Sequence, residues 1–149
     1  MKPKHTPIRG AKQRALQFAS KKDDTYDPET GEPVDYPDGY QGSFVRPEAF
    51  DKLSDDEWDE LSNYLAEKYD SKEHVGVYEG NVETSFHIIN LDDAKELLYT
   101  FKQDTILDWK NKHLLGTDDW EDAFVWNEIR SEDRGKVDYD EIIRRIRGT

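Results

Sequence analysis

Residues Ser54 to Tyr69 carry the clearest local pattern in this sequence, that of a capped amphipathic helix. Ser54 followed three residues later by Glu57 is the pattern of a capping box, in which each side chain bonds the backbone N–H of the other residue. Apolar side chains then recur at helical spacing, with Tyr64 alongside them: Trp58, Leu61, Leu65 and Tyr69. The sequence therefore predicts a helix from about Asp55 to Tyr69.

Two β-rich runs follow this helix, from His74 to Glu79 and from Val82 to Ile89. The dipeptide Gly80-Asn81 separates them and fits a two-residue turn with Gly at its first central position. The sequence therefore predicts a β-hairpin, in a register that places His74 opposite His87.

The flanking segments extend this pattern to β-α-β-β-α-β. A strand begins near Tyr40 and is closed by Pro47, and Asn90 caps a helix with an apolar stripe that ends near Phe101. A short strand over residues 105–109 completes the order, which is that of a ferredoxin-like α+β fold with an antiparallel sheet. Two additional C-terminal helices are expected, one from Thr117 through Ile129 and one beginning near Asp138.

Composition favours one folded domain with an N-terminal arm. The chain has 149 residues, and although only 34% are hydrophobic, it has four Trp, eight Tyr and six Phe to build a core. Residues 1–38 carry a possible short basic helix and then an acidic, proline-containing stretch without periodicity. We expect a flexible arm and linker over 1–38 and a single acidic α+β domain over 39–149.

Charge is distributed unevenly along the chain. The net charge is −13, but residues 1–22 carry seven basic residues and no acid. The remainder holds 34 acidic against 14 basic residues. Such a surface repels nucleic acid and acidic membranes and attracts a basic protein, which is the partner that we expect.

Several classes of protein have no support in the sequence. No apolar run is long enough to cross a bilayer or to serve as a signal peptide, so we expect a cytoplasmic protein. There is no Cys, which removes disulfides and thiolate catalysis. No phosphate-binding glycine loop, G-x-S-x-G or H-E-x-x-H motif is present, and we expect no cofactor.

The predicted hairpin offers the best candidate for a small site. One of its faces gathers the polar residues His74, Tyr78, Glu83, Ser85 and His87. Two opposed imidazoles could share a metal or a proton, with Glu83 as a further ligand. The alternative is the ordinary polar face of a half-buried hairpin, which the same alternation produces.

A second motif lies near the C-terminus. Residues 135–141 resemble the second half of an EF-hand calcium loop, with Gly135 at its sixth position and Glu141 at its twelfth. Arg130 and Arg134 then occupy the first and fifth positions, where oxygen ligands are needed. A helix capped by Asp138 explains the same residues.

Two clusters of acids around a Trp each open a predicted helix. They are candidates for partner binding, because rows of carboxylates can occupy a basic groove built for phosphates. Acids at helix N-termini also favour the helix dipole, which is the alternative explanation. The candidate residues are Asp55, Asp56, Asp59, Glu60, Asp118, Asp119, Glu121 and Asp122.

Three segments between Tyr40 and Trp109 resemble small accessory proteins of bacteriophages and mobile elements: GYQGSFVRPEAF, HVGVYEGNVETSFHI and KQDTILDWKN. The resemblance implies an anti-restriction or anti-CRISPR inhibitor, which binds a host-defence protein in the bacterial cytoplasm. It carries over no catalytic residue. The alternatives are a small metal-dependent or hydrolytic enzyme that uses His74, His87 and Glu83, and a structural or scaffolding phage protein.

Overall fold

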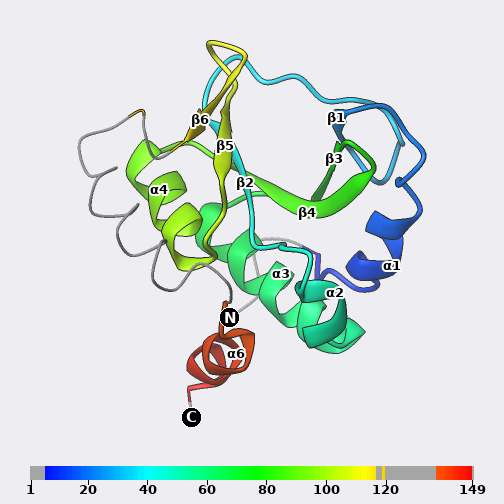
Figure 1. Cartoon of the computed structure of the whole chain (residues 1–149), viewed down its shortest axis with the longest axis vertical. Helices are drawn as coiled ribbons and strands as arrows, with labels where there is room; N and C mark the ends of the chain where they lie inside the picture. Colours follow the sequence, from blue (N-terminus) through cyan, green and yellow to red (C-terminus); the bar gives the residue numbers. More distant parts are fainter. Residues whose placement is uncertain (1–5, 117–118, 120–136, 149) are drawn as a thin grey trace.

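A computed structural model describes residues 6–116, 119 and 137–148 of the chain. It is an α+β structure built on one curled, antiparallel sheet (Figure 1). The strands, in the order β1-β3-β4-β2-β5-β6, are β1 (Asp24–Tyr26), β3 (His74–Tyr78), β4 (Asn81–Ile88), β2 (Tyr40–Ser43), β5 (Thr105–Asp108) and β6 (His113–Gly116). The four strands expected from sequence lie at the centre, and β1 and β6 are additional edge strands.

The structure describes five helices, of which α1, α3 and α4 pack against one face of the sheet and α6 lies against α3 (Figure 1). They are α1 (Ala11–Leu16), α2 (Ala49–Lys52), α3 (Asp55–Tyr69), α4 (Leu91–Thr100) and α6 (Tyr139–Arg147). The capping box of α3 is present as predicted, since the Glu57 N–H donates to Ser54 Oγ at 3.1 Å and the Ser54 N–H to Glu57 Oε1 at 3.0 Å. Asn90 caps α4 and Asp138 caps α6, also as predicted.

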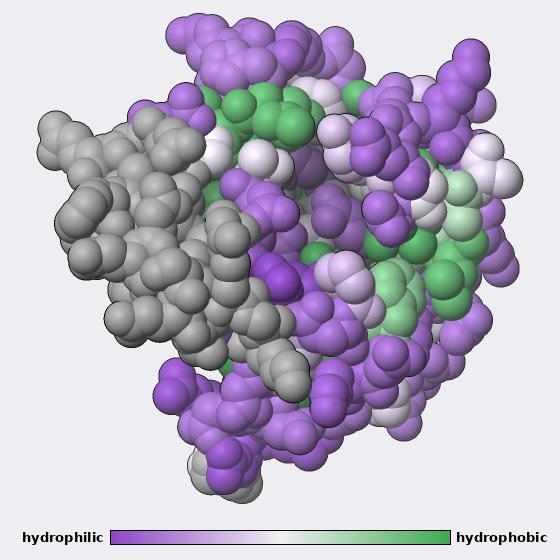
Figure 2. All heavy atoms as spheres, viewed as in Figure 1, coloured by the Kyte–Doolittle hydropathy of each residue, from purple (hydrophilic) through white to green (hydrophobic). Residues whose placement is uncertain are grey.

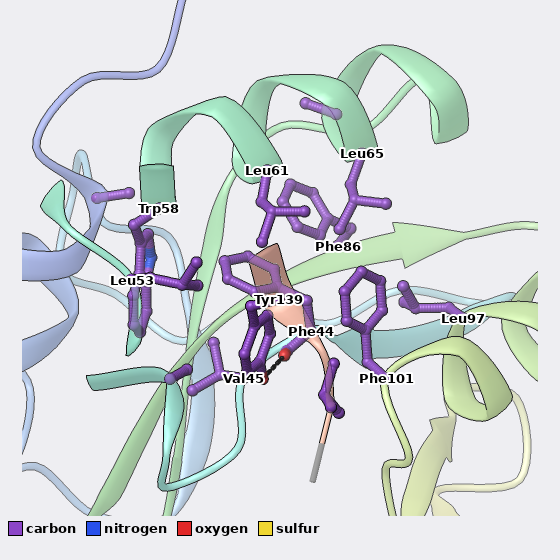
Figure 3. Packing of buried hydrophobic residues seen from close by; sticks show 14 of the residues in the cluster. Phe44, Val45, Leu53, Trp58, Leu61, Leu65, Phe86, Leu97, Phe101 and Tyr139 are labelled. Atoms are coloured by element: carbon purple, nitrogen blue, oxygen red, sulfur yellow. Dashed lines mark hydrogen bonds between the residues drawn. The ribbon is translucent and has the colours of Figure 1, made fainter. Parts of the chain in front are cut away.

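The core lies between α3 and the sheet (Figure 3). Trp58 is fully buried beside Phe44, and its indole N–H donates to Thr84 Oγ1 at 2.9 Å. The hydroxyl of Tyr139 at the start of α6 donates to the backbone carbonyl of Phe44 at 2.7 Å. These bonds satisfy the polar atoms of two large aromatic side chains that would otherwise be costly to bury.

The N-terminal segment differs from the expected arm and linker. Ala11 and Ala15 of α1 are fully buried, Phe18 and Tyr26 are nearly so, and β1 pairs with β3. The helix lies against α3, while Phe18 and Tyr26 pack with the valines of β3 and β4. A short helix was expected in this segment but its packing was not, because small alanines and isolated aromatics produce no extended apolar period.

The hairpin turn differs from the predicted one by one residue. Its central residues are Glu79 and Gly80, with φ of 49° and 82°, rather than Gly80 and Asn81. Positive φ at both positions is the geometry of a type I′ turn, whose twist matches that of the strands. His74 therefore pairs with Ser85 and not with His87, although both histidines stay on the predicted face.

Two expectations lie outside the described residues. The helix predicted from Thr117 through Ile129 is one of them, and the first half of the EF-hand-like segment, with Arg130 and Arg134, is the other.

Candidate functional site: the polar face of the sheet

The face of the sheet opposite the helices carries polar side chains from several strands. We call it the polar face: it consists of Gln41 and Ser43 of β2, His74, Gly76 and Tyr78 of β3, and Glu83, Ser85 and His87 of β4. Alternation along each strand puts these residues on one side, as the sequence predicted for the hairpin. Gln41, Ser43, His74 and Ser85 are nevertheless buried, so this face is partly covered and is not a simple solvated surface.

Tyr36 covers one end of the polar face. Its ring stacks on His87 with 4.0 Å between centroids, and its hydroxyl bonds His74 Nε2 at 2.6 Å. Trp109 meets the Tyr36 ring edge-on at 5.4 Å. The two histidines are therefore brought together through Tyr36, and each already has a partner in the chain.

His74 is held in its neutral form. It is fully buried, and desolvation, followed by the charges of Lys72 and His87, lowers its pKa to about 4. Its Nδ1 atom is buried without a hydrogen-bond partner among the described residues. A neutral imidazole could ligate a metal, yet the described part of the chain holds no group of three His, Cys, Asp or Glu side chains suited to one.

A short chain of hydrogen bonds fixes the middle of the polar face. The indole N–H of Trp109 donates to Gln41 Oε1 at 3.0 Å, and Gln41 Nε2 donates to Ser85 Oγ at 2.9 Å. Ser43 Oγ donates to the Thr84 carbonyl at 2.7 Å and accepts from the Val45 N–H at 2.9 Å. These side chains are rigidly placed, because each is bonded to a partner on another strand or loop.

A recess of about 580 Å³ opens over the other end of the polar face. It is lined from both edges of the curled sheet, by Thr25 of β1 and by Leu114 of β6, with Glu83 between them. The space-filling view is hollowed over this part of the sheet, and most residues around the hollow are hydrophilic (Figure 2). We call this hollow the recess.

Glu83 is a second titratable group on the polar face with a shifted pKa. Desolvation raises its pKa to about 7. Its side chain lies across Gly76, where an added Cβ would come within 3.0 Å of Glu83 Cγ and Oε1. The Glu83 side chain can adopt this position because residue 76 is a glycine and has no Cβ.

The acids predicted to bind a partner have mixed surroundings. Asp55 and Asp56 are exposed at the start of α3, and Asp55 lies 3.4 Å from Gln13 Nε2 of α1. Asp59 accepts hydrogen bonds from the backbone at the start of α1, and Glu60 is paired with Arg147 of α6. Asp119 accepts from the Gly116 N–H at 2.7 Å. Asp118, Glu121 and Asp122 lie outside the described residues.

Sequence reasoning missed three residues of the polar face and its cover. Gln41 and Ser43 could have been found, because the alternation in residues 40–44 places them opposite Tyr40, Gly42 and Phe44. Tyr36 gave almost no signal, since it lies in a proline-rich acidic stretch with no periodicity.

Comparison with known proteins adds no relative. The chain matches no protein-family model, no curated protein and no solved structure. In the segments that the structure describes, no helix combines the length and the apolar character needed to cross a membrane.

Proposed function

We propose that this protein is a non-enzymatic inhibitor or adaptor, of phage or mobile-element origin, that binds a basic, nucleic-acid-binding surface of a host-defence protein. The observation that supports the proposal is the charge imbalance. Even if every Lys and Arg formed an ion pair with one acid, thirteen carboxylates would remain. Such an excess speeds encounter with a basic partner and disfavours nucleic acid itself.

Exposed acids at the start of α3 are the proposed point of contact. Asp55 and Asp56 lie in the first turn of α3 and are exposed, and the contacts of Asp55 with α1 are long, with Gln13 Nε2 at 3.4 Å from its carboxylate. Asp59 and Glu60, which follow them, are bonded more closely to residues of the N-terminal segment and of α6. The usable part of this acidic cluster is therefore its N-terminal end.

A matched pair of double reversals tests this proposal. Asp55 and Asp56 are changed together to Lys, and the control changes Asp92 and Asp93, which are equally exposed acids in the first turn of α4. Tagged proteins are used to capture partners from bacterial lysate at about 50 and 300 mM salt, a range over which surface attraction weakens strongly.

We expect a captured nucleic-acid-binding protein that is released at high salt and lost with the α3 reversal but retained with the α4 reversal. Equal capture by both variants, or no such protein at low salt, would count against the proposal. The two alternatives predict other outcomes: a reaction that depends on His74, His87 and Glu83 for an enzyme, and co-assembly with virion proteins for a structural component.

We further propose that β2, α3, β3, β4, α4 and β5 form a split βαβ unit of the ferredoxin-like kind. The antiparallel order β3-β4-β2-β5 within the sheet supports this assignment, with β1 and β6 as extensions at the two edges. An experimental structure with the same four central strands and both helices on one face would test it.

A further inference from the structure

We propose that the recess is a binding site for an ammonium or guanidinium group, with the carboxylate of Glu83 as its counter-ion. This site lies on the sheet and is separate from the acids of α3. The proposal of a cation site does not depend on the proposed function, because binding of a small cation can be measured without a protein partner.

The position of Glu83 is the first argument. Its side chain is half-buried, and its carboxyl group lies over Gly76 of the neighbouring strand, where desolvation raises its pKa. Burial of a carboxylate is unfavourable unless a cation or several hydrogen-bond donors compensate it. The hydroxyl of Ser43 nearby donates to the Thr84 carbonyl and so is not available to this carboxylate, and no cation among the described residues lowers the pKa of Glu83.

The charges around the recess are the second argument. Of its described lining residues, Asp23, Asp24, Asp104 and Glu83 are acids and Arg46 is the one cation. The Arg46 guanidinium is already committed, since Nε bonds Glu48 at 2.8 Å and Nη1 bonds the Lys102 carbonyl at 2.5 Å. The described lining of the recess therefore has more acids than cations, and the guanidinium group of Arg46 is already bonded to Glu48 and to the Lys102 carbonyl.

The shape and lining are the third argument. A volume of about 580 Å³ admits an aliphatic chain with a charged end. Tyr78 and Leu114 line the recess and are 59% and 52% exposed, so they offer apolar surface to the methylene groups of such a chain. Tyr78 also offers an aromatic ring, which attracts a cation above its face.

The test uses isotope-labelled full-length protein and NMR titration. The probes are n-butylammonium, ethylguanidinium and neutral n-butanol, followed by a short peptide with one central Arg and the same peptide with citrulline. Citrulline keeps the shape of the side chain and removes its charge. The variants are Glu83→Gln and, as a control, Asp56→Asn, because Asp56 is an exposed acid that does not line the recess.

We expect both cations to give saturable shifts at residues of the recess, among them Thr25, Ser43 and Thr105, and to lower the pKa of Glu83 measured from its carboxyl carbon. Glu83→Gln should weaken binding at least tenfold, while Asp56→Asn should leave it within twofold. Binding of the Arg peptide more tightly than ethylguanidinium would identify a protein side chain as the source of the cation, and equal or weaker binding would identify a small amine or guanidine.

The proposal is overturned if no cationic probe gives saturable shifts up to about 50 mM, or if citrulline or butanol binds as well as its charged counterpart. Undiminished binding to Glu83→Gln would also overturn it. Should that variant fold poorly, the pKa of Glu83 in the unmodified protein decides the question, because a bound cation must lower it.

Discussion

The carboxylate of Asp59 accepts a hydrogen bond from the backbone N–H of Gly10 at 2.8 Å, across 49 residues of sequence. Its second oxygen accepts from the Ala11 N–H at 3.0 Å, so one side chain of α3 caps the start of α1. Asn63, one turn further along α3, bonds both the N–H and the carbonyl of Ile8. The acidic surface of α3 thus serves partly to hold the N-terminal segment in place.

Replacing Asp59 by Lys should destabilise the protein, whereas the same change at Asp56 should not. Loss of the cap leaves two backbone donors of α1 without their acceptor, at a cost of about 1 to 3 kcal/mol in the free energy of unfolding. Asp56 is exposed, and its reversal should matter by less than about 0.5 kcal/mol. Urea unfolding measures both, and equal stabilities would show that the cap contributes nothing.

The N-terminal segment should contribute to the stability of the domain. Phe18 is 6% exposed against Tyr26 and the valines of β3 and β4, whereas Leu16 on the same segment is 42% exposed. Phe18→Ala should therefore cost about 3 kcal/mol or more, and Leu16→Ala less than about 1 kcal/mol. Thermal unfolding followed by circular dichroism compares them. A Phe18→Ala protein as stable as the Leu16→Ala protein would restore the view of this segment as a loose arm.

Features set by residues close together in the sequence were predicted, whereas contacts between distant segments were not. The capping box of α3 and the polar alternation of the hairpin are local patterns, and both are present as predicted. The turn was misplaced by one residue because Glu79 adopts a positive φ, which local propensity disfavours for Glu and the twist of the hairpin requires. The cap from Asp59 to α1 and the cover from Tyr36 join segments 49 and 38 residues apart, and one sequence contains no pattern for such contacts.

Tyr36→Phe should destabilise the protein through His74. The substitution keeps the aromatic ring on His87 but removes the hydroxyl that bonds His74 Nε2 at 2.6 Å. The buried imidazole would then lack partners at both nitrogens, because Nδ1 has none among the described residues. We expect a cost of about 1 to 3 kcal/mol in the free energy of unfolding.

Tyr40→Phe is a suitable control for that change, because Tyr40 lies on the helix-covered side of β2 and does not contact His74. Nitrogen-15 NMR of His74 gives a second readout, since loss of the hydroxyl should change its tautomer balance. An unchanged His74 spectrum together with unchanged stability would contradict the role assigned to the hydroxyl of Tyr36.

The effect of Glu83→Gln on the free energy of unfolding should depend on pH, and it should be more favourable to the variant at pH 8 than at pH 4. The pKa of Glu83 is about 7 in the folded protein and about 4.5 in the unfolded chain, so the folded state binds the proton more tightly. The stability that this proton contributes is fully present below pH 4.5 and is lost as the pH rises through 7. Gln cannot lose a proton and does not share this loss. The difference in unfolding free energy between variant and unmodified protein should therefore shift in favour of the variant by up to about 3 kcal/mol between pH 4 and pH 8.

The opposite contribution of His74, whose low pKa makes stability fall as the pH drops from 6.5 towards 4, is present in both proteins and cancels in this difference. Urea unfolding at several pH values measures the shift, and Asp56→Gln, at an exposed acid, should show no comparable change. A flat difference across this range would mean that Glu83 titrates as an ordinary solvated carboxylate and that the recess does not desolvate it.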